Sequence, residues 1–310
     1  MKIRQVLFIV NPVSAGGLTL KVWNDLVLNL EAVPFGYDVQ FTKKPGDGCK
    51  LAQDAVAKNY YDTIVSVGGD GSASDVVNGL MTAGVSHANL PAFTIFPSGT
   101  GSDSVRTLKI PKDVKSFVRV VEGYQPVLVD VGITEFVTDT KQAGVHYFLN
   151  ACEIGIGAVV ANVVNGVDSK KRGKAKYFRQ VVEQTFRFER FNATYVYDGD
   201  SSAVEDSSVI AICNGMFFGG GMQISPKSKL DDGILELVAT NRVSKVGLIG
   251  IVLKLYAGTH IPHPKINFHQ AKGFDIKLKT PQLLEADGEV VSTITKATFK
   301  TLPQVLKVLR

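Results

Sequence analysis

The stretch SVGGDGSASDVVNGL, residues 66–80, passes from an apolar run into a helical pattern within a few residues. Glycine allows a sharp turn and lets another group approach the backbone closely, and the stretch contains Gly68, Gly69 and Gly71. The residues behind them have the spacing of one apolar helix face: Ala73, Val76, Val77 and Leu80. A strand, a glycine turn and a helix in this order predict one βα unit of a parallel sheet.

The same pattern extends across the first third of the chain. Short runs rich in β-branched and aromatic residues predict buried parallel strands at residues 5–10, 63–67 and 92–96. Helical patterns separate them, at residues 18–33, 47–59 and 73–84. This alternation predicts an open α/β sheet, in which ligands bind at the carboxyl ends of the strands. Unusual loops follow those ends: NPVSAGG (11–17), GGDGS (68–72) and PSGTGSD (97–103).

From Val127 onwards the pattern changes to short strands bounded by turn residues, with helical patterns near residues 173–188 and 243–257. This pattern predicts an antiparallel β domain, either a sandwich or a barrel-like structure. The last residues, LPQVLKVLR (302–310), resemble a helix that folds back on the first domain. We therefore expect an α/β N-terminal nucleotide-binding domain at 1–127, joined by residues 297–310, and a β-rich antiparallel sandwich C-terminal domain at 128–296.

The composition is that of an ordinary globular protein, with 45% hydrophobic and 20% charged residues among 310. The cysteines lie far apart without CxxC or Cys/His spacing, which argues against a disulfide framework or zinc site and favours a reducing cytoplasm: Cys49, Cys152 and Cys213. The later apolar stretch at residues 246–258 contains Lys254 and is too short to span a membrane. The net charge of +5 is mild, and no basic tail or aromatic–basic alternation points to nucleic acid.

The turn before the predicted helix has the features of an anion site, because free N–H groups and the helix dipole both favour negative charge. Ser72 or Ser74 is suited to cap this helix. Asp70 repels a phosphate unless Mg²⁺ bridges the two, or unless it accepts hydrogen bonds from a ribose or a basic side chain. The alternative is a tight βα turn in which Asp70 serves only as a turn former.

The third loop, PSGTGSD, strengthens the nucleotide interpretation. The hydroxyl of Thr100 is able to bond phosphate, and its neighbours are Gly99 and Gly101. Asp103 and Arg106 are three residues apart, within reach of each other on one helical turn. A capped turn with a surface ion pair is the alternative. The first loop, NPVSAGG, lacks GxGxxG, which argues against a Rossmann dehydrogenase.

The three loops resemble those of the diacylglycerol kinase catalytic family, especially its soluble bacterial lipid kinases. NPVSAGG resembles the family's NPxSG, GGDGSASDVVNGL its GGDGTxNEVxNGL, and PSGTGSD its PxGTGND. In the second half, FLNACEIGIGAVV resembles the Asn-x-x-x-Gly-x-Gly strand, and CNGMFFGGGMQISPKSKLDDGILEL the Asn…GGG…P…DG-x-L segment. YAGTHIPHPKI and LLEADGEVV resemble its Gly-x-His…Pro turn and its DGE motif. These motifs follow the family's order over nearly the whole chain.

The resemblance implies a kinase that transfers the γ-phosphate of ATP to a lipid hydroxyl of the diacylglycerol type, with Mg²⁺. Asp287 matches the family's general base, which a poor nucleophile such as a lipid hydroxyl needs. The implied metal residues are Asp70, Asp103 and, at a structural site, Asp232. The implied ATP-binding residues are Asn11, Ser14, Gly68, Gly69, Asp70, Gly71, Ser72, Gly99, Thr100, Gly101, Asp103 and Arg106. Without the family, Asp287 and Gly288 predict an ordinary hairpin turn.

The chain departs from the family pattern at several positions. Gly16 and Gly17 stand where a basic residue is usual, and Ser102 replaces an asparagine. Lys229 lies three residues before Asp232, where some members have an acidic ligand, and its charge can substitute for the cation. A kinase of a soluble metabolite, as in the NAD kinases and phosphofructokinases, stays open, as does a nucleotide-binding regulator without catalysis. An apolar channel between the domains favours a lipid substrate, and a polar one favours a sugar or NAD.

The expected partner is a lipid at a membrane surface, so we expect a cytoplasmic protein that associates transiently with the membrane and serves phospholipid biosynthesis. A homodimer stays open. The densest basic run, SKKRGKAK at residues 169–176, is either a solvated loop face or a contact to ATP phosphates or anionic headgroups, through Lys170 or Lys174. The apolar helix near residues 243–257 is expected to pack in the core rather than against a membrane.

Overall fold

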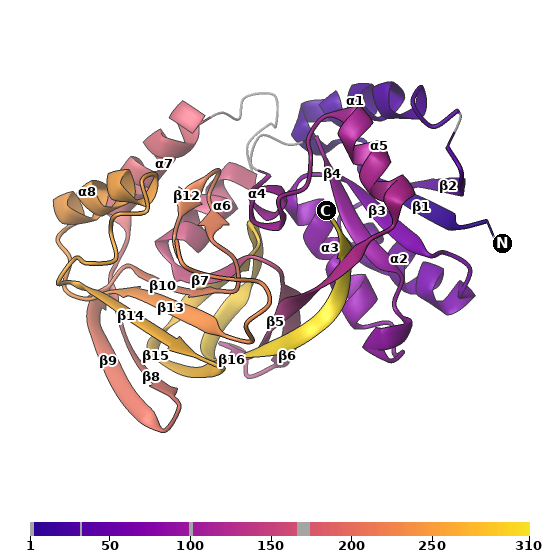
Figure 1. Cartoon of the computed structure of the whole chain (residues 1–310). Coiled ribbons are helices and arrows are strands. Elements are labelled where there is room, and N and C mark those ends of the chain that lie inside the picture. Colours follow the sequence, from indigo (N-terminus) through magenta and orange to yellow (C-terminus); the bar gives the residue numbers. More distant parts are fainter. Residues whose placement is uncertain (1–2, 32, 99–101, 166–173) are drawn as a thin grey trace. The chain divides into compact units, whose positions relative to one another are not determined.

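The computed structural model describes residues 3–31, 33–98, 102–165 and 174–310. The chain divides into two compact units, which Figure 1 colours by sequence position. Unit 1 comprises Met1–Val129 together with Gln304–Arg310, and unit 2 comprises Asp130–Pro303. The chain therefore passes from unit 1 to unit 2 and then returns to unit 1.

Unit 1 is built on a parallel sheet in the order β4-β3-β1-β2. Its strands are β1 (Gln5–Val10), β2 (Gly36–Phe41), β3 (Thr63–Gly68) and β4 (Ala92–Pro97). Every residue of β3 is buried, as are all but one residue each of β1 and β4, as expected for strands covered on both faces. The end of β16 (Glu289–Leu309) joins this sheet, because Val308 pairs in parallel with Phe93 of β4.

Helices cover both faces of this sheet, with α1 and α5 on one side and α2 and α3 on the other (Figure 1). The helices are α1 (Leu18–Val27), α2 (Asp47–Lys58), α3 (Asp70–Met81), α4 (Asp103–Leu108) and α5 (Val114–Gly123), with short 3-10 turns at Ser14–Gly17 and His87–Asn89. This architecture confirms the predicted α/β domain. Helix α3 begins at Asp70, with Gly69 as its N-cap and no side-chain cap, so the prediction of a Ser72 or Ser74 cap is wrong.

Unit 2 consists mainly of antiparallel strands, as the second half of the sequence predicts. One sheet has the order β14-β13-β10-β7-β15, and β15 also pairs with β16 and β8. The strands are β5 (Pro126–Thr138), β6 (Ala143–Phe148), β7 (Ala151–Gly155), β8 (Phe191–Tyr197), β9 (Asp200–Ser207), β10 (Val209–Cys213), β11 (Phe217–Phe218), β12 (Met222–Gln223), β13 (Leu235–Thr240), β14 (Ile266–Ala271) and β15 (Gly273–Ala286). The helices are α6 (Ile156–Asn165), α7 (Lys174–Arg187) and α8 (Lys245–Leu255).

The central strands of unit 2 supply side chains to two apolar cores. Ile154 of β7 packs into the first core, which also contains Phe274 of β15. Ala151 of the same strand packs into the second core, which contains Ile251 of α8. Because successive side chains of a strand point to opposite faces, Glu153 lies on the face of the second core. The sheet is therefore covered on both faces, as in a sandwich.

The C-terminal segment is a strand, which corrects the expected helix. β16 extends to Leu309, and Leu306, Val308 and Leu309 are buried. The hydroxyl of Thr94 donates to the carbonyl of Leu309 over 2.8 Å, which fixes the segment beside β4. The apolar spacing of LPQVLKVLR suits either structure, and the free hydrogen-bonding side of β4 decides for the strand.

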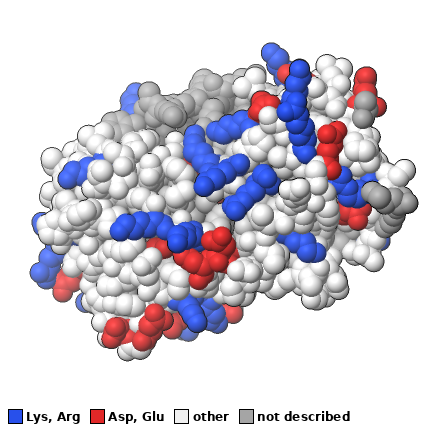
Figure 2. All heavy atoms as spheres, viewed as in Figure 1, with Lys and Arg blue, Asp and Glu red and all other residues white. Residues whose placement is uncertain are grey.

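Among the described residues, no helix has both the length and the apolar character that crossing a bilayer demands. Helix α8 was expected to pack in the core, and it buries Leu248 and Ile251 in unit 2. Two of its apolar side chains are nevertheless exposed, Val246 at 72% and Leu253 at 57%. On the face shown in Figure 2, basic and acidic side chains are interspersed, in keeping with the mild net charge of +5.

Candidate functional site

Asp70 opens α3 directly behind β3, at the carboxyl end of a strand of the parallel sheet. Its Oδ1 accepts a hydrogen bond of 2.9 Å from the backbone N–H of Ser104, and its Oδ2 accepts one of 3.1 Å from the N–H of Asp103. These N–H groups lie in the first turn of α4, where a helix offers them no carbonyl partner. Asp70 therefore joins the starts of two helices, and backbone N–H dipoles balance part of its negative charge.

Asp103 and Arg106 form the ion pair that their spacing predicts. Nη1 of Arg106 lies 2.6 Å from Oδ1 of Asp103, and the two side chains are 25% and 8% exposed, respectively. Because the pair is largely shielded from water, its attraction is screened less than that of an exposed surface pair. Arg106, in the last turn of the short helix α4, is thus a basic group held against Asp103, whose backbone N–H donates to Asp70.

Polar side chains connect the first loop to the other two. Nδ2 of Asn11 donates to Oγ of Ser72 over 2.9 Å. The hydroxyl of Ser14 donates to the carbonyl of Asn11 over 3.1 Å and lies 3.3 Å from Oγ of Ser98. Thr19 contacts Oγ of Ser14, and its own hydroxyl lies 2.6 Å from Oγ of Ser98. The sequence analysis did not identify Thr19 or Ser98. The pattern that could have indicated them is a hydroxyl residue in or beside each of the loops.

Two glycines shape the turn before α3 in different ways. A Cβ at Gly68 would lie 2.5 Å from Oγ of Ser72, so the protein's own packing demands glycine there. A Cβ at Gly69 would meet no described atom within 4 Å, and its φ of −96° suits any residue. The space before the Gly69 backbone is therefore left open by the described chain. Gly71 lies in the first turn of α3, and three predicted residues lie outside the described residues: Gly99, Thr100 and Gly101.

Asp287 and Gly288 form the turn between β15 and β16, with φ values of 49° and 89°. Two positive φ values in a two-residue hairpin are what Asp-Gly favours, as the sequence predicts. Oδ2 of Asp287 accepts a bond of 2.7 Å from the N–H of Leu149, and Oδ1 accepts bonds of 2.8 Å and 3.1 Å from those of Asn150 and Ala151. The residue is 9% exposed. Its carboxylate therefore anchors the turn to the start of β7.

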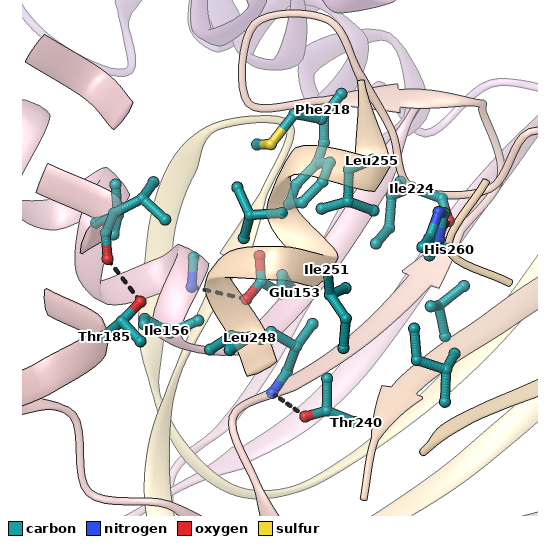
Figure 3. Close-up of a pocket in the computed structure, with 18 residues that line it drawn as sticks. Glu153, Ile156, Thr185, Phe218, Ile224, Thr240, Leu248, Ile251, Leu255 and His260 are labelled. Atoms are coloured by element: carbon teal, nitrogen blue, oxygen red, sulfur yellow. Dashed lines mark hydrogen bonds between the residues drawn. The ribbon is translucent and has the colours of Figure 1, made fainter. Parts of the chain in front are cut away.

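Unit 2 contains an apolar cavity between its sheet and its helices (Figure 3). The free space among the lining residues is about 600 Å³, which includes the part open to solvent. The apolar part of the lining comes from α6, α7, α8 and the strands beneath them, for example Ile156, Val160, Val181, Leu248, Ile251 and Leu255. His260 also lines the cavity, and its Nε2 lies 2.9 Å from the carbonyl of Ile224.

Glu153 is an acidic side chain in the lining of this cavity. It is 1% exposed and pairs across the sheet with Glu285 of β15, which is 4% exposed. Burial raises the pKa of Glu153 to about 8, and burial together with the facing Glu153 raises the pKa of Glu285 well above its ordinary value. The sequence analysis did not identify either residue, although a glutamate within the apolar strand ACEIG was visible as a break in the pattern.

Within the part of the chain that the structure describes, no three His, Cys, Asp or Glu side chains are grouped to hold a metal ion. Asp232 is exposed, and its Oδ1 accepts a bond of 3.1 Å from the N–H of Ile234. The structure thus places Asp232 in a turn before β13. Lys170 lies outside the described residues, as does most of the basic run at 169–176, and the side chain of Lys174 is not described either.

Two family models match the chain in succession. Residues 5–133 match the diacylglycerol kinase catalytic domain. Residues 150–310 match the YegS C-terminal NAD kinase beta sandwich-like domain. The two matches follow the order of the α/β and β-rich parts of the fold.

Full-length relatives support the same grouping. A diacylglycerol kinase of Staphylococcus saprophyticus is 27% identical over 290 residues, covering 92% of this chain and 89% of that protein. A diacylglycerol kinase of Staphylococcus epidermidis is 26% identical over 309 residues, covering 98% of this chain and 92% of that protein.

Solved structures share the fold. That of a diacylglycerol kinase from Bacillus anthracis aligns with a TM-score of 0.70 at 21% identity, covering 100% of this chain and 97% of the other. Yeast NADH kinase in complex with NADH aligns with a TM-score of 0.52 at 11% identity, covering 99% and 83%. The predicted combination of an α/β domain and a β-rich sandwich domain is thereby confirmed. Together the two models span nearly the whole chain, which therefore belongs to the diacylglycerol kinase family with a YegS-type C-terminal domain, and this membership supports a kinase.

Proposed function

We propose that this protein is an ATP-dependent lipid kinase that transfers the γ-phosphate of ATP to the hydroxyl of a diacylglycerol-like lipid, with Mg²⁺. Family membership supports the kinase part. The observation that carries the lipid part is the apolar cavity of unit 2. The proposal places the protein in the cytoplasm, where it meets its lipid transiently at a membrane surface, and its three cysteines are free thiols in the structure.

The cavity suits an acyl chain better than a polar substrate. Its lining is almost wholly apolar, and its polar side chains are those of Glu153, Thr185, Thr240 and His260. A sugar or a nicotinamide nucleotide placed there would bury hydroxyl or phosphate groups among apolar side chains, where unpaired polar groups are costly. An acyl chain instead exchanges water for apolar contacts, which is favourable. A lipid is therefore the substrate class that this lining favours.

The loops of unit 1 support the nucleotide part. The described residues leave the space before the Gly69 backbone open to an approaching phosphate, and hydrogen bonds hold Asn11, Ser14 and Ser72 at the first two loops. Each carboxylate oxygen of Asp70 accepts one hydrogen bond among the described residues. A carboxylate oxygen with one hydrogen bond still has a lone pair for a metal ion. Mg²⁺ is commonly bound by one or two carboxylates together with substrate phosphates.

When bound, Mg²⁺ would neutralise charge on the transferred phosphoryl group. Asp70 and Asp103 are the residues that would hold it. Arg106 would contribute positive charge through its position beside Asp103. The remaining proposed phosphate contacts come from the third loop, at Gly99, Thr100 and Gly101, and from the turn at Gly68, Gly69 and Gly71.

In the proposed reaction Asp287 accepts the proton of the lipid hydroxyl. The hydroxyl oxygen then bonds to the γ-phosphorus while the bond between that phosphorus and ADP breaks. The three backbone N–H donors to Asp287 support this role, because they fix the orientation of the carboxylate. The same bonds also anchor the turn that contains Asp287. The test must therefore separate a loss of catalysis from a loss of stability.

The proposal is tested with purified protein, Mg²⁺, γ-labelled ATP and a panel of diacylglycerols, NAD and sugars. We expect label in the diacylglycerols. Label in NAD or a sugar would refute the lipid acceptor, and nucleotide binding by calorimetry without any transfer would instead indicate a regulator. Asp287→Asn is expected to lower the rate by about 10²-fold or more, and an unchanged rate would refute its role as base. Urea unfolding of the same variant shows how much of the lost rate comes from destabilisation of the turn that Asp287 anchors.

A pair of tryptophan variants on α8 tests the cavity. Leu248 lines the cavity and is 3% exposed, whereas Val246 on the same helix is 72% exposed. Leu248→Trp is expected to fill part of the cavity and to lower lipid phosphorylation, while Val246→Trp serves as the matched control. Equal rates for the two variants would refute the cavity as the acyl-chain site.

A further inference from the structure

The carboxyl of Glu153 is built into the wall of the cavity. Figure 3 shows it projecting among apolar side chains, with one dashed hydrogen bond. Its Oε1 accepts that bond, of 2.7 Å, from the N–H of Gly157 in the first turn of α6. A Cβ at Gly157 would lie 1.7 Å from Oε2 of Glu153. Glycine at 157 is therefore what makes room for the carboxyl, and Oε2 has no hydrogen-bond partner among the described residues.

Glu153 is neutral at physiological pH in this setting. Burial raises its pKa to about 8, and the equally buried Glu285 faces it directly across the sheet. Two buried carboxylates at adjacent strand positions repel each other, so protonation relieves both the repulsion and the desolvation. Since Oε1 accepts the hydrogen bond from Gly157, the proton belongs on Oε2. The cavity wall thus carries an O–H donor that has no acceptor among the described residues.

The other polar side chains of the cavity have their hydrogens committed. The hydroxyl of Thr185 donates to the carbonyl of Val181 over 2.7 Å. The hydroxyl of Thr240 lies 3.2 Å from Oγ of Ser207, whose own hydrogen goes to the carbonyl of Val209, so Thr240 is the donor of that pair. Nε2 of His260 must donate to the carbonyl of Ile224, because a carbonyl oxygen only accepts. That assignment leaves Nδ1 of His260 as an acceptor, which offers nothing to a carbonyl. Glu153 is therefore the one cavity side chain with a donor to spare for a ligand, within the lining that the structure describes.

We propose that Glu153 selects lipids that carry an ester or amide carbonyl in their buried part, by donating a hydrogen bond from Oε2 to the carbonyl oxygen. This proposal rests on the proposed lipid kinase function and names the substrate feature that the cavity recognises. A carbonyl is an acceptor without a hydrogen of its own, so it satisfies the donor and leaves no new polar group unpaired. A hydrocarbon or ether chain leaves the donor with a weaker acceptor or none.

Charged lipids fit this wall less well. A fatty-acid carboxylate would add a third acidic group beside Glu153 and Glu285, which like-charge repulsion and burial both oppose. An amine would need an ionised Glu153 as its partner, and burial opposes that form. A neutral carbonyl demands neither change.

The groups that face Glu153 bear on how pH affects this contact. Glu285 faces it from β15, and Cys213 of β10 is also near enough to interact electrostatically. His260 lines the same cavity, and burial lowers its pKa, so it stays neutral. Among the described residues, those that α7 and α8 contribute to the lining are apolar or threonine. Loss of the proton on Glu153 is therefore what weakens the contact to a lipid carbonyl as pH approaches 8.

The test compares a diacylglycerol with its dialkyl ether analogue, which has the same chains and hydroxyl but no carbonyls. Binding is measured by displacement of a fluorescent acyl probe in detergent micelles, and phosphorylation is measured separately. We expect wild type to bind the ester about tenfold more tightly, the value of one buried hydrogen bond. Glu153→Gln keeps an N–H donor and should keep the preference. Glu153→Met removes the donor and should bring the ester-to-ether ratio close to one. Glu189→Gln, at an exposed glutamate, is the control.

The outcomes separate this inference from the proposed function. An equal ester-to-ether ratio in wild type and Glu153→Met would overturn the role of Glu153, whatever the rate of phosphorylation. Binding with the expected ratio but without phosphorylation would overturn the kinase proposal and uphold the contact. In wild type the ester preference should fall as pH rises above 8, and in Glu153→Gln it should not. A preference that falls equally in both would also overturn the inference.

Discussion

Raising the pH from about 6 to about 9 is expected to destabilise unit 2, because Glu153 must lose its proton while its carboxyl stays in the cavity wall. The pKa of Glu153 is about 8 in the folded protein, against an ordinary value of 4.5. A carboxyl whose folded pKa is raised contributes stability that is fully present below its unfolded pKa and is lost as pH rises through the folded pKa. Each pH unit between the two values removes about 1.4 kcal/mol. The loss from pH 6 to pH 9 is therefore about 3 kcal/mol.

Urea unfolding followed by far-UV circular dichroism measures this loss in wild type, Glu153→Gln and the exposed control Glu189→Gln. Glu285 has its pKa raised in the same direction, so it adds to the wild-type slope and keeps some slope in Glu153→Gln. Trp23, the one tryptophan of the sequence, lies in α1 of unit 1, so its fluorescence follows the other unit as an internal reference. If wild type and Glu153→Gln lost the same stability over this pH range, Glu153 would not be protonated as argued.

Three substitutions test other details by urea unfolding or ligand titration. Gly157→Ala is expected to cost about 2 to 4 kcal/mol, because its Cβ displaces the Glu153 carboxyl. Gly250→Ala, at an exposed position of α8, should instead gain up to about 1 kcal/mol; equal effects would contradict the close approach. Ser244→Ala removes the N-cap of α8, a bond of 3.1 Å, and should cost about 1 kcal/mol, and no change would show that the cap is unimportant. Asp70→Asn replaces one acceptor oxygen by a donor amide, so calorimetric ATP affinity and the stability of unit 1, read by tryptophan fluorescence, should both fall; unchanged ATP affinity would count against the nucleotide site.

The strongly patterned parts of the fold were predictable from sequence. Residues 5–10, 63–67 and 92–96 are continuous apolar runs, and they form β1, β3 and β4 of the parallel sheet. Strand β2 was not predicted, because GYDVQF contains no continuous apolar run, and none of its residues is buried. The C-terminal strand was also missed, since its partner β4 lies about two hundred residues earlier and local spacing says nothing of such a pairing.

In the candidate site, too, local features were predictable from the sequence and long-range contacts were not. The glycine loops and the Asp103–Arg106 pair follow from spacing along the chain. The hydrogen bonds from α4 to Asp70 do not, because they join residues more than thirty positions apart. The cavity and its raised carboxyl pKa depend on side chains from β7, α6, α7 and α8 meeting in space, which periodicity cannot describe. Asp287 was readable as a turn residue, but its three backbone donors were not.

The return of β16 to unit 1 has a consequence for synthesis of the protein on the ribosome. When residues 1–129 have emerged, the flank of β4 still lacks its neighbour, because Gln304–Arg310 are made only after all of unit 2. Until then the hydroxyl of Thr94 lacks its acceptor, the carbonyl of Leu309, and the carbonyl of Ala88 lacks its donor, the ammonium of Lys307. The nascent unit therefore presents an open strand edge for most of translation, and open edges invite pairing with other chains. The first unit to be translated is the last to be completed.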